Sequence, residues 1–297
     1  MSLVINHNMM AMNAARNMGA AFTLLSNSIR RLSSGLRIAS AADDAAGLAV
    51  RELMRADIAS MHQGIRNIND AISLIQTADG AAQVIDEKLV RMKELAEQAA
   101  TGTYNSDQRL MIDSEYQAMA SEITRIANST DFNGVHLLNG NLSGENSAHN
   151  GAGLVSLGPL KVHFGTGNDS AEDYYYISIG NTTASALGIG NQSTVGAGYS
   201  VSTQQGAQQA LAALNQAIVS KDKIRAHLGA LQNRLYAVTN LQIMAENLQA
   251  SESRISDVDV ALEMTEFVRN QIVSQAAVAM LAQANALPRL ALQLLGA

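Results

Sequence analysis

Apolar residues recur at three- and four-residue steps at both ends of the chain. Between residues 270 and 297 the only charged side chain is that of Arg289, and residues 1–29 carry only Arg16. The repeat near the carboxyl end consists of Ile272, Ala276, Ala279, Met280, Gln283, Leu287, Leu290 and Leu294. Such spacing places most of its members on one side of a helix. Both ends are therefore expected to be amphipathic helices with one face for burial.

Polar amides divide this carboxyl-terminal repeat too often for a membrane span. A bilayer-spanning helix needs about 20 predominantly apolar residues, whereas this segment contains Gln271, Gln275, Gln283, Asn285 and Gln293. Pro288 is expected to end or kink the helix. Two interpretations stay open: a self-contained helical core, or two ends that remain exposed until other copies of the chain cover them.

A heptad repeat runs through the first third of the chain. Its members are Ile58, Met61, Ile65, Ile68, Ile72 and Ile75, followed by Ala82, Ile85, Leu89, Met92, Ala96 and Ala99. Consecutive three-residue steps at Ile72, Ile75 and Ala78 form a stammer, which locally overwinds a coiled coil. The repeat predicts one helix over 44–99, roughly 80 Å long at about 1.5 Å per residue.

A non-helical joint is predicted just before this long helix. Ser33, Ser34 and Gly35 interrupt the helical pattern, and Gly35 is expected to adopt a backbone conformation that a residue with a Cβ resists. Ser40 or Asp43 is the expected cap of the following helix. The Asp43–Asp44 pair resembles a metal or acid–base site only weakly, because no His or third carboxylate lies nearby in the sequence.

Further helices are predicted on both sides of a glycine-rich middle. One spans 106–129, and a long seam from Leu211 to Ile255 predicts a return helix with Lys221, Asp222, Lys223 and Arg225 at solvated positions. In the middle, Phe132-Asn133-Gly134 is a turn signal, and 160–164 and 174–179 are strand candidates. His136, His149 and His163 lack metal-ligand spacing.

The composition excludes several classes of function. The chain has no Cys, which excludes disulfides and thiol catalysis. Its net charge of -6 does not indicate a nucleic-acid-binding protein. No HExxH motif or paired His is present, so neither a catalytic residue nor a metal or cofactor is expected. The start lacks a basic n-region followed by a cleavable apolar core, so the ordinary secretory route is not expected.

The predicted fold is mainly α, with long antiparallel helices forming a rod-like or coiled-coil core, a small β-rich central module and paired chain ends. Five segments are expected: an N-terminal helix and joint (1–43), outer helices (44–135), a β-hairpin and short variable module (136–201), a return helix (202–250) and a C-terminal helix (251–297).

Sequence blocks at the joints of this plan resemble those of bacterial flagellin. In the first part they are INHN (5–8), RLSSGLRI (31–38), AADDAAGLA (41–49), QTADGA (76–81), RMKELA (91–96) and FNG (132–134). In the last part they are GALQNRL (229–235), ENL (246–248), ESRI (252–255) and QAN (283–285). The resemblance covers about the first 140 and the last 95 residues.

This resemblance implies a non-enzymatic subunit that polymerises with other copies of itself into the flagellar filament for swimming. It also implies export through the flagellar type III apparatus without cleavage, a location in the extracellular flagellum, and contacts with an export chaperone and with hook-junction and cap proteins. The alternatives are a hook–filament junction protein and, from another class, a secreted translocator that inserts into membranes.

The resemblance also indicates a possible contact with an innate immune receptor. Arg91, Leu95 and Glu115 match positions through which many flagellins meet a host Toll-like receptor. Arg91 and Leu95 lie one helical turn apart and are expected to share a face. An ordinary contact between subunits is the alternative role for the same three residues.

Overall fold

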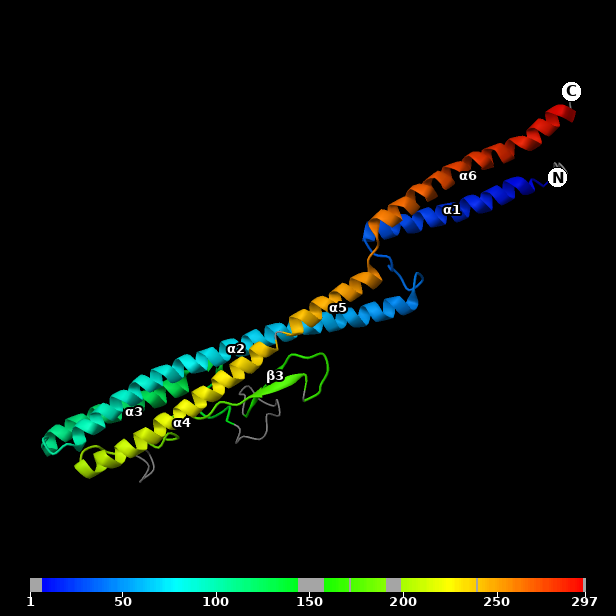
Figure 1. Ribbon diagram of the computed structural model, residues 1–297. Coiled ribbons are helices and arrows are strands. Elements are labelled where there is room, and N and C mark those ends of the chain that lie inside the picture. Colours follow the sequence, from blue (N-terminus) through cyan, green and yellow to red (C-terminus); the bar gives the residue numbers. More distant parts are fainter. Residues whose placement is uncertain (1–6, 144–157, 171, 191–198, 239, 296–297) are drawn as a thin grey trace. The chain divides into compact units, whose positions relative to one another are not determined.

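The computed structural model describes residues 7–143, 158–170, 172–190, 199–238 and 240–295, which contain six α-helices and four short strands (Figure 1). The helices are α1 (Met9–Ser34), α2 (Ala45–Ala100), α3 (Ser106–Ser129), α4 (Gln204–Ala237), α5 (Asn240–Ser256) and α6 (Val260–Leu295). The strands are β1 (Asp131–Phe132), β2 (Val135–His136), β3 (Leu160–His163) and β4 (Tyr174–Ile177). Parts of the predicted module, including His149, lie outside the described residues.

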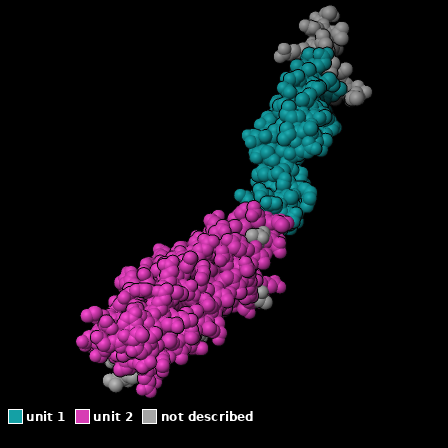
Figure 2. All heavy atoms as spheres, turned by 60° about the vertical axis from the view of Figure 1, so that its left-hand side comes forward, with its two compact units in different colours: residues 1–58, 245–297 teal, residues 59–244 magenta. Residues whose placement is uncertain are grey.

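The chain divides into two compact units, coloured separately in Figure 2. Unit 1 consists of residues 1–58 and 245–297, and unit 2 of residues 59–244. Unit 1 therefore combines the two end segments of the sequence, whereas unit 2 is one continuous stretch.

The heptad repeat predicted for α2 forms the core of unit 2. Its positions from Ile68 to Ala99 are buried, and they pack with apolar residues of α3 and α4. The neighbouring helices run antiparallel to α2: Asp79 pairs with Arg225 of α4, and the Ala99 carbonyl accepts a hydrogen bond from Arg109 of α3. The predicted bounds of α2 and α3 agree with the structure to within one residue.

One predicted solvated position of α4 is buried. Lys221 is only 1% exposed, and its Nζ pairs with Asp86 of α2 and with Asp222. The prediction failed because Lys221 lies on the face of α4 that meets α2. The Asp86 carboxylate of α2 offsets the free-energy cost of burying the ammonium group there.

The β-rich module has the predicted strands. β1 and β2 form a hairpin whose turn residues Asn133 and Gly134 have φ values of 51° and 80°, as a tight hairpin turn requires. β3 and β4 pair antiparallel, with Leu160 opposite Ile177. The end of β3 lies against α2, because Asn67 donates a hydrogen bond to the His163 carbonyl at 2.8 Å.

Of the two effects expected of Pro288, an end of the helix does not occur, since α6 continues to Leu295, and a kink stays a prediction. Two other local predictions in the helices were wrong. The predicted return helix is divided between α4 and α5. The cap of α2 is neither Ser40 nor Asp43. Asp44 accepts the hydrogen bond from the Gly47 amide, while Asp43 instead accepts from Ser40 within the preceding loop.

The fold class predicted from the sequence is confirmed: the protein is mainly helical, with long antiparallel helices and two small antiparallel sheets. No described helix has enough length and apolar character to cross a bilayer.

Candidate functional site

The two terminal helices of unit 1 pair along a narrow seam whose most buried side chains are small. α1 and α6 lie side by side and antiparallel (Figure 1). The most buried residues of the seam are Ala21, Ser28, Ser274 and Ala284. Intermediate exposure continues the seam in heptad steps along α1 at Ala11, Ala14, Met18, Leu25 and Leu32, and along α6 at Phe267, Asn270, Ala277 and Leu281.

Large apolar side chains of the same two helices lie outside this seam. The exposed ones are Met9, Met10, Met12, Phe22, Leu24 and Ile29 on α1, and Val260, Leu262, Met264, Val268, Ile272, Val273, Val278 and Met280 on α6. Full burial of one such side chain contributes about 1.5–3 kcal/mol. The structure therefore buries only small residues between the helices and leaves most of the described large apolar groups uncovered.

The apolar repeat that the sequence singled out in α6 belongs to this uncovered surface from Ile272 to Gln283. Ile272 and Met280 are 60% and 65% exposed, so this part of the repeat does not face α1. The side chains of its last members, Leu287, Leu290 and Leu294, lie outside the described part of the chain. A groove of about 480 Å³ runs between the two helices and is lined by Met10, Asn13, Ala14, Asn17, Val273, Ala276, Ala277 and Met280. We call these outward residues and the groove the terminal apolar surface.

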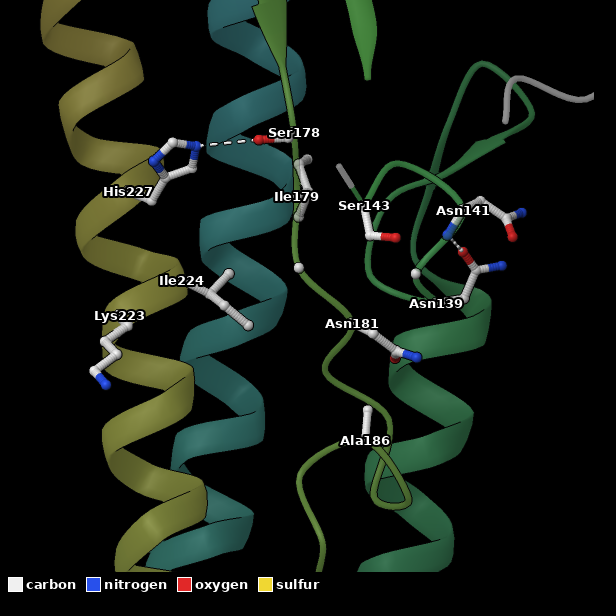
Figure 3. Close-up of a pocket in the computed structure, with 12 residues that line it drawn as sticks. Asn139, Asn141, Ser143, Ser178, Ile179, Asn181, Ala186, Lys223, Ile224 and His227 are labelled. Atoms are coloured by element: carbon white, nitrogen blue, oxygen red, sulfur yellow. Dashed lines mark hydrogen bonds between the residues drawn. The ribbon is translucent and has the colours of Figure 1, made fainter. Parts of the chain in front are cut away.

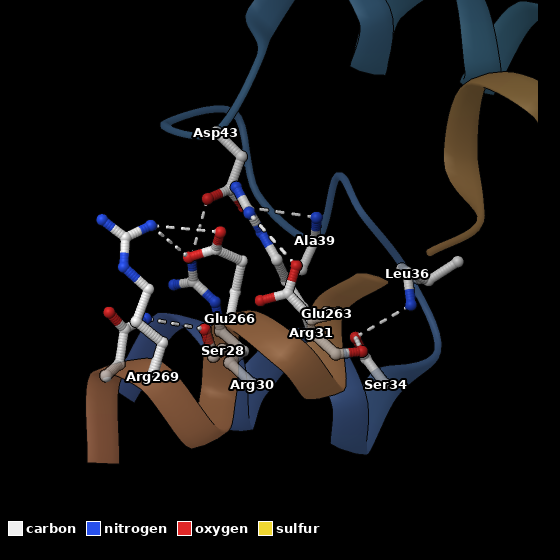
Figure 4. Close-up of polar contacts among 11 residues, drawn as sticks. Ser28, Arg30, Arg31, Ser34, Leu36, Ala39, Asp43, Glu263, Glu266 and Arg269 are labelled. Atoms are coloured by element: carbon white, nitrogen blue, oxygen red, sulfur yellow. Dashed lines mark hydrogen bonds and ion pairs between the residues drawn. The ribbon is translucent and has the colours of Figure 1, made fainter. Parts of the chain in front are cut away.

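Polar contacts connect α1 with α6 at both ends of the seam. Near the carboxyl end of α1, Asn270 donates to the Ser28 hydroxyl at 3.4 Å, and Arg31 pairs with Glu263 at 3.6 Å (Figure 4). Near its amino end, the side chain of Asn8 donates to the Ala284 carbonyl at 2.8 Å.

The joint after α1 is held by backbone pairing with the joint before α6. The Gly35 carbonyl accepts from the Val258 amide at 3.0 Å, and the Arg37 amide donates to the Ser256 carbonyl at 2.7 Å. Gly35 has a φ of 72°, in the left-handed region, as expected from the sequence. The joint is therefore a fixed connection within unit 1.

Asp43 holds together the loop between this joint and α2. Its carboxylate accepts hydrogen bonds from Ala39 and Ser40 and pairs with Arg30 at 2.7 Å (Figure 4). The hydrogen bonds from Ser40, together with the charge of Arg30, keep the pKa of Asp43 below its usual value. Asp43 thus has a structural role in the loop.

The three residues of the possible receptor contact are divided between surface and core. Arg91 Nε and Nη2 donate to Glu115 Oε1 at 3.0 and 2.9 Å, and Arg91 Nη1 donates to Glu94. These hydrogen bonds, chiefly the ones to Glu115, raise the pKa of Arg91. Leu95 is 2% exposed and belongs to the core of unit 2. The structure therefore presents the Arg91–Glu115 pair at the surface and keeps Leu95 within the core.

Unit 2 contains a groove of about 800 Å³ that is lined mainly by polar residues, unlike the terminal apolar surface (Figure 3). Lys223 and His227 of α4 line one side and Asn139, Asn141 and Asn181 the other. The described residues contain no group of three His, Cys, Asp or Glu side chains that could hold a metal ion. The terminal apolar surface is therefore the feature of the molecule that points to a function.

Comparisons with known proteins agree on one family. A family model described as the bacterial flagellin N-terminal helical region matches residues 5–143, and one described as the bacterial flagellin C-terminal helical region matches residues 211–295. The flagellar filament 33 kDa core protein of Treponema phagedenis is 40% identical over 297 residues, which cover 99% of this chain and 100% of the relative. A flagellin of Halalkalibacterium halodurans is 41% identical over 294 residues, with the same shares covered.

Among solved structures, the crystal structure of Bacillus cereus flagellin aligns with a TM-score of 0.46 and 29% identity. The alignment covers 63% of this chain and 94% of that one.

Proposed function

The chain belongs to the bacterial flagellin family and is a structural subunit of the flagellar filament, and we propose that it polymerises through its terminal apolar surface. The observation that carries this proposal is the packing of unit 1: the buried residues between α1 and α6 are small, and most of the large apolar side chains described on the two helices face outward. Neighbouring copies would cover those side chains in the filament.

The same packing supports a difference between the free and the assembled chain. Ordering the backbone costs about 1–2 kcal/mol per residue, and a seam whose buried side chains are only Ala and Ser recovers little of that cost. We infer that α1 and α6 open readily in the free subunit. The helical pair in the structure would then be the form that assembly stabilises.

The filament is extracellular, so we propose that the subunit leaves the cell uncleaved through the flagellar type III apparatus. In this proposal an export chaperone covers the terminal apolar surface of α6 before export, and hook-junction and cap proteins contact the assembled chain. Segments 1–43 and 251–297 would form the inner part of the filament and 44–135 and 202–250 the outer part. The module at 136–201 would have a structural role without catalysis.

A role as hook–filament junction protein has less support. The relatives that cover 99% of the chain carry the names flagellin and filament core protein. Those names favour the filament itself.

Truncation after Gln283 tests the assembly proposal. The shortened chain should remain a monomer in salt conditions that polymerise the full chain, because it lacks the end of α6. Thermal melting of unit 2 should be unchanged, since the core of that unit contains no residue of α6. Electron microscopy checks the first expectation, and filaments of normal diameter from the shortened chain would contradict it.

We further propose that the Arg91–Glu115 pair contacts a host Toll-like receptor on free subunits, with Leu95 supporting the surface from below. Arg91→Asp should reduce signalling by receptor-bearing cells at least tenfold, because it places a carboxylate beside Glu115 and Glu94. The matched control is Arg125→Asp on α3, which removes an exposed Arg–Glu pair elsewhere in unit 2. Equal signalling from both variants would remove this proposal.

A further inference from the structure

We propose that Asn8 and Pro288 together fix the register of α1 against α6, because the Asn8 side chain supplies the hydrogen bond that Pro288 removes from the α6 backbone. We call this arrangement the register lock. Its test uses filaments and in that respect rests on the proposed function.

Pro288 leaves one carbonyl of α6 without its helical partner. In an α-helix the amide of residue 288 would donate to the carbonyl of Ala284, but proline has no N–H to donate. α6 nevertheless continues to Leu295, so this carbonyl lies in the interior of the helix. Ala284 is 8% exposed. A carbonyl left unpaired in such a position costs about 1–3 kcal/mol.

Asn8 meets this carbonyl from the first turn of α1. Its Nδ2 donates to the Ala284 carbonyl at 2.8 Å, while its Oδ1 accepts from the Ala11 amide at 3.0 Å and so caps α1. An amide side chain has a donor and an acceptor on separate atoms, and therefore performs both tasks at once. Asp and Ser serve as helix caps, but Asp lacks the donor and Ser lacks the reach.

The rest of the seam specifies the register only weakly. Only Ala and Ser side chains occupy its most buried positions, and such short side chains interlock little with the partner helix. The polar contacts at the far end, Ser28–Asn270 and Arg31–Glu263, are long at 3.4 and 3.6 Å. After a slip of one turn, Asn8 would face a carbonyl that already has its helical partner. The freed Ala284 carbonyl therefore distinguishes one register from its neighbours.

Register in turn determines which outward side chains lie together. The terminal apolar surface combines residues of both helices, for example Met10 of α1 with Val273 and Met280 of α6 along the groove. A slip of one turn moves one half of this surface by about 5.4 Å relative to the other. The lock would thereby keep the surface in the shape that neighbouring subunits must match.

A double-mutant cycle on polymerised full-length protein tests the lock. Asn8→Ser and Asn8→Asp retain a capping oxygen but lose the amide donor, and Pro288→Ala returns the N–H that the Ala284 carbonyl lacks. Each Asn8 variant should lower the midpoint of thermal depolymerisation. In the Pro288→Ala background the same Asn8 variants should have less than half of that effect, because the carbonyl then has a partner within α6. Both variants lose the amide donor, but only Asn8→Asp adds a charge. Equal effects of Asn8→Ser and Asn8→Asp on the midpoint would therefore assign the change to the lost donor.

Additive effects of the Asn8 and Pro288 substitutions would overturn the lock. If an Asn8 variant forms no filaments, the double variant decides: filaments return if the lock is correct and remain absent if it is not. Absence of filaments from the unaltered chain would contradict the proposed function instead. In that event the same single and double variants are compared by thermal loss of helix content in the full-length monomer. Additive effects of the Asn8 and Pro288 substitutions on that melting would again overturn the lock.

Discussion

At the scale of single residues, charge placement within unit 2 depends on contacts distant in the sequence. Lys221 and Lys223 are two residues apart on α4, yet only Lys221 is buried, with Asp86 of α2 at its ammonium group. Arg225 repeats the arrangement one turn later with Asp79. These pairs connect α4 to α2 at defined positions along both helices.

Lys221→Ala should therefore destabilise unit 2 by about 1–3 kcal/mol, since it leaves the Asp86 carboxylate without its partner and empties a buried site. The matched control Lys223→Ala should change the free energy of unfolding by no more than about 0.5 kcal/mol, because Lys223 is exposed. Urea unfolding of the monomer measures both. Equal effects of the two substitutions would mean that the buried ion pair contributes nothing to stability.

Contacts of this kind could not be read from the sequence. A lysine among Asp222, Lys223 and Arg225 has the local pattern of a solvated face, and its partner Asp86 is 135 residues away. The Asn8–Ala284 contact was missed for the same reason, although Asn before an apolar helix and Pro288 near the end were both visible. What was lacking was the register that brings residues 8 and 284 together.

At the scale of elements, the long helices were the most predictable part of the fold. A helix that buries one stripe must repeat its apolar residues at that stripe, so the heptad pattern from Ile68 to Ala99 was visible without the structure. The break between α4 and α5 was not, because the sequence around Val238 contains neither Gly nor Pro. The terminal apolar surface was only partly predicted: the repeat was found, but its outward direction depends on which face of α6 meets α1.

The joint at Gly35 is an element whose geometry can be tested by substitution. Gly35→Val should cost about 1–2 kcal/mol within unit 1, because a branched side chain resists a φ of 72° while no neighbouring atom obstructs its Cβ. Melting of unit 2 should be unchanged. The expected result is a straight or poorly formed filament, seen by electron microscopy, with reduced swimming despite normal export.

Gly35→Asn is the matched control for this joint, since Asn tolerates the left-handed conformation far better than Val. Filaments of Gly35→Asn should keep their normal curvature. Normal curvature in the Val variant as well would show that the joint does not determine filament shape. A large loss of stability in unit 2 would show instead that the joint is part of that core.

At the scale of the whole molecule, the two units have different roles: unit 2 makes the free subunit stable, and the terminal helices of unit 1 serve assembly. Unit 2 has a large apolar core of its own, whereas the described side chains of α1 and α6 in unit 1 include six and eight large apolar ones that are exposed and none that is buried. Unit 2 is thus expected to fold in the free subunit, and the terminal helices are expected to become stable when other copies cover them. The same division suits a chain that we propose is exported in an unfolded state.

Hydrogen–deuterium exchange of the full-length chain before and after salt-induced polymerisation tests this division most directly. The amides of residues 9–34 and 260–295 should exchange within seconds in the monomer and become strongly protected in the filament. Residues 68–99 of α2 should be protected in both states. Strong protection of the terminal helices in the monomer, or their continued rapid exchange in the filament, would contradict the claim that assembly buries the terminal apolar surface.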